Sequence, residues 1–91
     1  MSNSVAPEAN ILYTDGRKVP VVPKNGTDFK LDELQKIVGG YIETINLPGG
    51  SLMVVNEEGL LDGLPSNRLA SRLAYQPIVG NAVVMAKSMM H

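Results

Sequence analysis

The residues best suited to bind a ligand lie in segment 63–68, which reads Gly-Leu-Pro-Ser-Asn-Arg. A turn here precedes an apolar-periodic stretch, so we expect a short helix from Pro65 to Leu73, with Pro65 or Ser66 in its first turn. The start of a helix offers free N–H donors, and the planar guanidinium of Arg68 matches phosphate or carboxylate geometry. Arg72 lies four residues on, on the same helical face. The segment therefore predicts an anion site.

Two further features bear on this site. In the ligand hypothesis Arg68 binds a phosphate, Asn67 reads a base or ribose edge beside Ser66, and Tyr41 stacks on the ligand. Tyr41 follows a Gly39-Gly40 pair that lets a ligand approach the backbone closely, and Glu43 comes two residues later. The structural alternative is that Arg68 forms an ion pair that fixes its loop, with one of three acids as partner: Glu43, Glu57 or Glu58.

Catalytic residue sets are largely missing from the sequence. There is no cysteine, and the only histidine is His91 at the end of the chain, which disfavours thiol chemistry and His-based catalysis or metal binding. The adjacent carboxylates of Glu57 and Glu58 are the remaining candidates for acid/base work, but neighbours in a turn usually point apart. We therefore expect no enzyme, no cofactor and no metal.

Charge and composition set further limits. Eight Lys and Arg against nine Asp and Glu give a formal net charge of -1, which disfavours general nucleic-acid binding. No stretch approaches the roughly 20 apolar residues that span a bilayer, and the N-terminus does not resemble a signal peptide. We expect a cytoplasmic protein with no membrane partner. Hydrophobic residues make up 44% of the 91 residues, which is enough for one small core.

Apolar alternation and turn signals predict the elements that position these residues. We expect an α+β fold in the order β-β-α-β-β-α-β, with a mainly antiparallel sheet and two short helices. The strands are predicted at 10–13, 19–22, 41–47, 51–55 and 78–85. A first helix, capped by Thr27 or Asp28, should end at Gly39. We expect a flexible tail over 1–9, a single domain over 10–86 and a Met-rich tail over 87–91, which either packs or is disordered.

Four blocks of the sequence resemble one known family. They begin at Leu34, Val55, Gly63 and Ile78 and read LQKIVGGYIE, VNEEG, GLPSNR and IVGNAVV. In order and spacing they resemble the small domain-of-unknown-function family 3846, over roughly residues 10 to 86. At position 66 this chain has Ser where the family pattern often has Pro. The resemblance implies an origin in a phage, prophage or mobile element, and action inside a bacterial host cell, but no mechanism.

Two functions from different classes follow. The first is a non-catalytic homo-oligomer that captures a small anionic, nucleotide-derived ligand, in a setting of bacterial antiphage defence. It would use Ser66, Asn67, Arg68, Arg72, Tyr41 and Glu43. The alternative is a protein that docks on a host enzyme through a sheet edge or its Met-rich end, with the Asn-Arg segment purely structural.

Overall fold

Five antiparallel strands form one sheet, and the computed structural model describes residues 9–90 of the chain. In sheet order the strands are β2-β1-β5-β4-β3, so β2 and β3 are the two edges. The strands are β1 (Ala9–Leu12), β2 (Lys18–Pro20), β3 (Ile42–Leu47), β4 (Ser51–Asn56) and β5 (Ala82–Ala86). The helices are α1 (Leu31–Val38) and α2 (Arg68–Ala74), with 3-10 turns at Pro48–Gly50 and Lys87–Met89.

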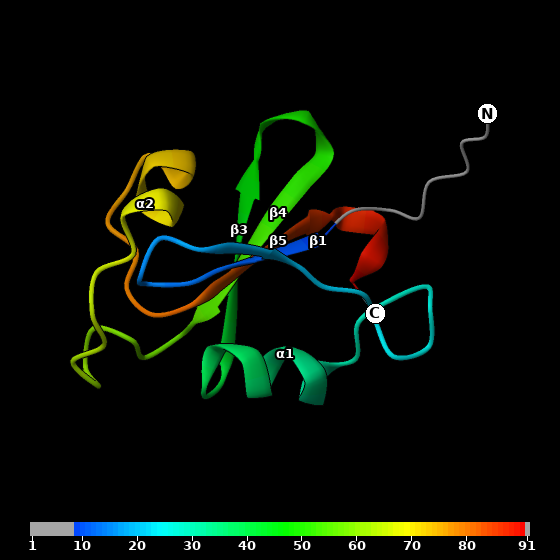
Figure 1. Cartoon of the computed structure of the whole chain (residues 1–91), viewed down its shortest axis with the longest axis horizontal. Coiled ribbons are helices and arrows are strands. Elements are labelled where there is room, and N and C mark those ends of the chain that lie inside the picture. Colours follow the sequence, from blue (N-terminus) through cyan, green and yellow to red (C-terminus); the bar gives the residue numbers. More distant parts are fainter. Residues whose placement is uncertain (1–8, 91) are drawn as a thin grey trace.

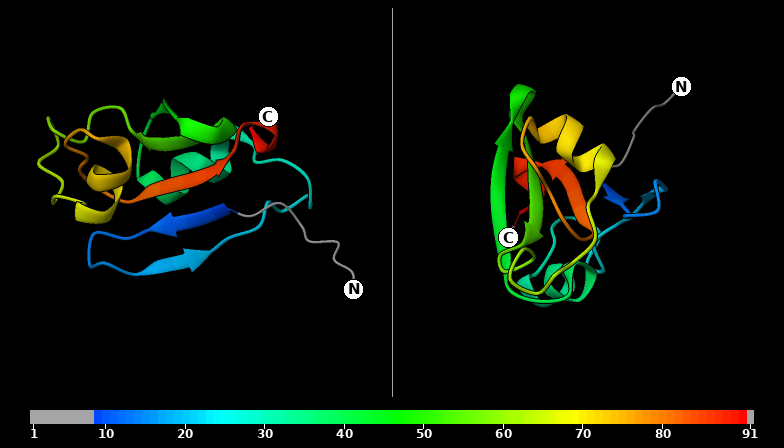
Figure 2. Two further views of the ribbon diagram at one scale, coloured as in Figure 1. Left: turned by 90° about the horizontal axis from the view of Figure 1, so that it is seen from above. Right: turned by 90° about the vertical axis from the view of Figure 1, so that its left-hand side faces the viewer.

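Each face of the sheet carries its own core, and one helix closes each core (Figure 1). Leu34 and Val38 of α1 pack on one face, together with alternate residues of the inner strands. Ala70 of α2 packs on the other face, against Leu12 and Met53. The α+β fold and the order β-β-α-β-β-α-β are therefore confirmed. Figure 2 shows the sheet from above and from its left-hand end.

The first helix begins later than the sequence predicts. The side chain of Asn25 accepts the N–H groups of Thr27 and Asp28 at 2.9 and 3.0 Å, which closes a turn over these residues before the helix starts. The helix begins at Leu31, and the carboxylate of Glu33 accepts the N–H of Lys30 at 3.1 Å. A Glu at the third helical position thus provides the cap that we expected from Thr27 or Asp28.

The ordered domain extends beyond the expected limits 10–86. Ala9 belongs to β1 and is 2% exposed. At the other end Met89 is also 2% exposed and packs in the α1-side core, where the N–H of Phe29 donates to its carbonyl at 2.7 Å. Residues 87–90 are therefore packed against the domain. The rest of the expected N-terminal tail, 1–8, and residue 91 lie outside the described residues.

Candidate functional site: the arginine face of helix α2

Helix α2 presents two arginines on the side away from its core contacts. Ala70 is completely buried, and Leu69 and Ala74 pack against the same core. A helix buries one stripe, so the residues on the opposite side face solvent. Arg68 and Arg72, one turn apart, are both exposed. They line one shallow depression together with Ser66, Ser71, Gln76 and Pro77, and we call this surface the arginine face.

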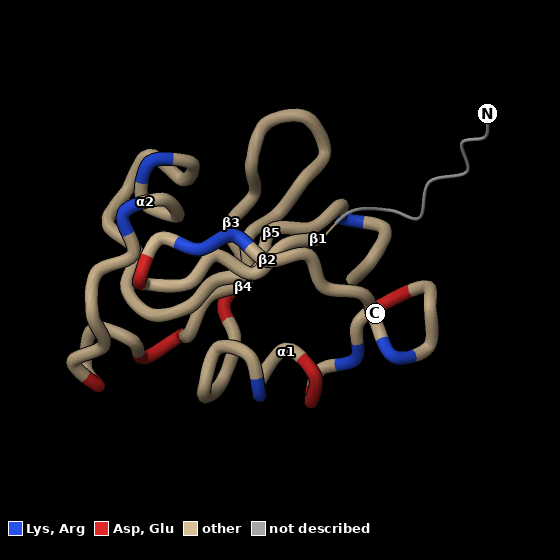
Figure 3. The backbone as a smooth tube through the Cα atoms, in the orientation of Figure 1, with Lys and Arg blue, Asp and Glu red and all other residues tan. Residues whose placement is uncertain are grey.

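Within residues 9–90, the arginine face has no counter-ion. Among residues 9–90 the only ion pair joins Arg17 to Asp15, whose Nε and Oδ2 atoms are 2.7 Å apart. The sequence left open an ion pair from Arg68 to Glu43, Glu57 or Glu58, and the described residues contain none. Figure 3 shows the basic residues of α2 apart from the acidic residues of the loop that joins β4 to α2. No described residue therefore occupies either guanidinium group, and both can bind an anion from solution.

Asn67 has a structural role instead of facing the depression. Its side chain is completely buried, and its Nδ2 donates to the carbonyls of Leu12 and Gly80 at 2.8 and 2.9 Å. Its Oδ1 accepts the N–H of Ala70 at 3.1 Å, which caps α2. Both amide hydrogens are thus used inside the fold, so Asn67 has no donor left for a base or ribose. The α2 helix has only seven residues, and Asn67 already caps its N-terminus. We therefore assign anion binding to the arginines and not to the start of the helix.

Two serines flank the depression in different ways. Ser66 is exposed and forms an isolated antiparallel bridge with Val79, which fixes the segment that enters α2. The hydroxyl of Ser71 donates to the carbonyl of Asn67 at 2.7 Å and accepts the N–H of Ile78 at 2.8 Å. These bonds hold the returning segment against α2 and place Gln76 beside the arginines.

Tyr41 and Glu43 lie in separate depressions. Tyr41 is 68% exposed and lines a depression with Gly39, Gly40, Asn56 and Asp62 among its neighbours. A Cβ atom on Gly40 would lie 3.0 Å from Nδ2 of Asn56, so this glycine serves close packing. Glu43 lines a third depression, on the β3 side of the sheet. The Glu43 depression shares Gln76 and Pro77 with the arginine face. The Tyr41 depression shares no lining residue with the arginine face.

Tyr75, which the sequence analysis did not single out, is an exposed aromatic residue at the C-terminal end of α2. It ends α2 in the left-handed conformation, with φ 56°, and it is 88% exposed. It is the only non-glycine residue in the described part of the chain with a positive φ. Bulky side chains rarely adopt this conformation, which usually selects Gly or Asn after a helix. The backbone thus holds an exposed tyrosine ring directly before Gln76. In the sequence, only the position of Tyr75 between the end of the predicted helix and Pro77 indicated this residue.

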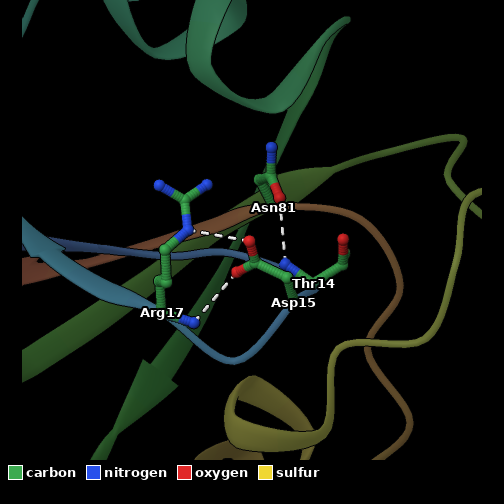
Figure 4. A network of polar contacts seen from close by, with 4 residues as sticks. All are labelled: Thr14, Asp15, Arg17 and Asn81. Atoms are coloured by element: carbon green, nitrogen blue, oxygen red, sulfur yellow. Dashed lines mark hydrogen bonds and ion pairs between the residues drawn. The ribbon is translucent and has the colours of Figure 1, made fainter.

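The turn between β1 and β2 carries a further polar network (Figure 4). The N–H of Thr14 donates to Oδ1 of Asn81 at 3.2 Å, which ties this turn to the segment before β5. Hydrogen bonds from the backbone N–H and then the side chain of Arg17 hold the pKa of Asp15 below its ordinary value of 3.8. The guanidinium of Arg17 also lies 4.4 Å from the centroid of the Tyr13 ring, so this arginine has both an ion pair and a ring contact within its hairpin.

Two features are absent from the part of the chain that the structure describes. Over residues 9–90 there is no group of three or more His, Asp or Glu placed to hold a metal ion. None of the helices in that range is long and apolar enough to cross a membrane.

Comparison with known proteins gives one match. The family model described as a domain of unknown function, DUF3846, matches residues 9–89. No curated protein and no solved structure matches the chain. The match covers every strand and both helices, from β1 through the 3-10 turn that ends at Met89. This chain therefore belongs to the DUF3846 family.

Proposed function

We propose that this protein is a non-catalytic binding protein that captures a small anionic, nucleotide-type ligand at the arginine face. The observation that carries the proposal is that Arg68 and Arg72 line one depression and have no counter-ion among residues 9–90. Residues four apart on a helix are separated by about 6 Å along its axis. This spacing lets two guanidinium groups contact one phosphate or two adjacent phosphates, each through paired N–H donors.

The ligand class follows from what surrounds the two arginines. Gln76 lines the depression and offers an amide that can donate to and accept from a base edge. Tyr75, the residue before Gln76, has an exposed ring on which a nucleobase can stack. Tyr75 thus takes the stacking role that the sequence suggested for Tyr41. The other lining groups are hydroxyls and a proline, and none is a general base near neutral pH. The surface suits recognition without chemistry.

The proposed setting is the cytoplasm of a bacterium that carries a phage or prophage. There, removal of a nucleotide signal would weaken an antiphage defence response. The support is the family resemblance together with the binding surface. We also propose that the chain self-associates, because a sheet edge stays open in the single copy. In a bacterium that expresses the protein, Arg68→Ala with Arg72→Ala should abolish any gain in phage plaque count that the unchanged protein gives.

Isothermal titration with ADP and with inorganic pyrophosphate tests the binding proposal. A bidentate charge-assisted contact contributes about 1.5–3 kcal/mol, so each single Arg→Ala variant should weaken binding about 10- to 100-fold. Lys36→Ala, at an exposed base on α1 outside the depression, is the matched control and should bind normally. Equal affinity of Arg68→Ala, Arg72→Ala and Lys36→Ala would refute the site. Failure of the unchanged protein to bind either probe would argue against the ligand class.

A further inference from the structure

Strand β3 is an open and unguarded sheet edge. It pairs only with β4, through six consecutive residue pairs from Ile42–Asn56 to Leu47–Ser51. It contains no proline, lysine or bulge, which are the usual protections of an edge strand. The opposite edge, β2, is three residues long and includes both Lys18 and Pro20. The two edges therefore differ, and β3 is the one built for pairing.

The register identifies the backbone groups that β3 leaves free. The N–H of Glu57 donates to the carbonyl of Tyr41 at 2.8 Å, which continues the β3–β4 ladder by one pair. Hydrogen-bonded and non-hydrogen-bonded pairs alternate along antiparallel strands. Odd-numbered residues of β3 therefore bond to β4. The N–H and C=O groups of Ile42, Thr44 and Asn46 point outward from the sheet.

We propose that β3 pairs antiparallel with β3 of a second copy, about a two-fold axis at Thr44, to give a continuous ten-stranded sheet. In this register Thr44 faces Thr44 of the second copy, and Ile42 faces Asn46 in both directions. These three pairs use every outward N–H and C=O group of both strands, in six hydrogen bonds. A register centred on Ile45 would form only four within the strands, because it would oppose Ile42 to Pro48, which has no N–H and lies in the 3-10 turn after β3.

The side chains of β3 fit a second copy of the same strand. Ile45 and Leu47 are partly buried at the margin of the α2-side core, and Ile42 at the margin of the α1-side core. Pairing covers these margins and joins each core to that of the second copy. Glu43 is the strand's only charge, and in this register the two Glu43 residues lie about 8 Å apart. That distance is close to the Debye length at physiological salt, so added salt should strengthen the dimer.

A second copy suits this edge better than an unrelated strand. It matches β3 in length, and the two-fold axis lets both strands use all of their outward N–H and C=O groups. Because β3 carries one charge over six residues, it offers no electrostatic selection for a charged foreign segment. The inference specifies the proposed self-association and does not depend on the arginine face.

Gel filtration with light scattering, over 5–500 μM protein, tests the dimer. Thr44 is exposed and its N–H points outward, so Thr44→Pro removes a donor to the second copy but none to β4. Thr44→Val keeps the N–H and is the matched control. We expect a dimer for the unchanged protein and for Thr44→Val, and a monomer with an unchanged circular dichroism spectrum for Thr44→Pro. A monomer at 500 μM, or a dimer in Thr44→Pro, would overturn the proposal.

Disulfide trapping tests the position of the axis. The chain has no cysteine, so a single introduced thiol can pair only with that of another copy. Paired residues in hydrogen-bonded register have Cα atoms about 5.5 Å apart, which suits a disulfide, whereas two Asn46 residues would be about 14 Å apart. Thr44→Cys should therefore cross-link rapidly in mild oxidant and Asn46→Cys should not. Equal rates would refute the register. The Thr44→Pro variant should still bind pyrophosphate, because the arginine face does not involve β3. This measurement therefore distinguishes a failure of the dimer proposal from a failure of the arginine-face proposal.

Discussion

Replacement of Asn67 by Ala should destabilise the protein more than any other single change at the candidate site. Its side chain joins three segments that are distant in sequence, because it bonds to the end of β1, to the segment before β5 and to the first turn of α2. The residue is completely buried. Without the amide, water cannot readily reach the carbonyls of Leu12 and Gly80 to replace the lost donors.

The magnitude follows from these three bonds. Loss of a helix cap costs about 1 kcal/mol, and each buried carbonyl left without a donor costs about 1–3 kcal/mol. Partial relaxation leaves an expected total of about 3–5 kcal/mol. A domain of this size has a free energy of unfolding of about 5–10 kcal/mol, so Asn67→Ala should remain folded at 10 °C but unfold well before the unchanged protein on heating.

Urea unfolding, followed by circular dichroism at 10 °C, measures the effect. The matched control is Asn81→Ala, because Asn81 is only partly buried and its Oδ1 makes a single bond, to the N–H of Thr14. We expect the control to lose about 1 kcal/mol. If Asn67→Ala loses no more free energy of unfolding than Asn81→Ala, Asn67 does not hold these segments together and the reasoning fails.

Three further predictions concern other positions. Tyr75→Gly should raise the free energy of unfolding by about 0.5–1 kcal/mol in thermal melts, because glycine suits the left-handed conformation. The same variant should weaken ADP binding in calorimetry, and unchanged binding would contradict the stacking role of Tyr75. Gly59→Ala should cost about 1–3 kcal/mol in urea unfolding, because its Cβ would lie 2.7 Å from Cγ2 of Val79, and Val79→Ala should recover part of the loss; full stability of Gly59→Ala would show that the contact relaxes freely. The lowered pKa of Asp15 means that its contribution to stability is present above pH 3.8 and is lost as pH falls through the folded-state value; an NMR titration that gives 3.8 or higher would contradict this.

Local sequence signals predicted the fold because local and tertiary preferences agree. The short apolar-rich runs of β3 and β4 and the apolar stripe of α1 each indicate the observed element. Both helices start later than the sequence predicts, α1 at Leu31 and α2 at Arg68 instead of Pro65, because side chains a few residues away decide the start. Asn67 caps α2. Asn25 closes a turn where a cap was expected, and the carboxylate of Glu33 bonds back to Lys30. Propensity rules do not decide between such competing caps.

The candidate site was only partly predictable. Arg68 and Arg72 were found from helical spacing, and the structure places them together on one depression. The burial of Asn67 depends on the carbonyls of Leu12 and Gly80, which are 55 and 13 residues away in sequence, so no local pattern indicates it. Tyr41 and Tyr75 are both exposed, and only the structure shows that Tyr41 lines a depression separate from the arginine face.

Native mass spectrometry of the purified protein, after incubation with a bacterial metabolite extract, tests the central claim most directly. It detects a captured molecule and the number of protein copies in one spectrum. We predict a dimer that retains an adduct of nucleotide mass, and loss of that adduct, with the dimer preserved, in the variant that carries Arg68→Ala and Arg72→Ala. Retention of the same adduct by this variant, or no adduct on the unchanged protein, would contradict the proposal that the arginine face binds a nucleotide-type ligand.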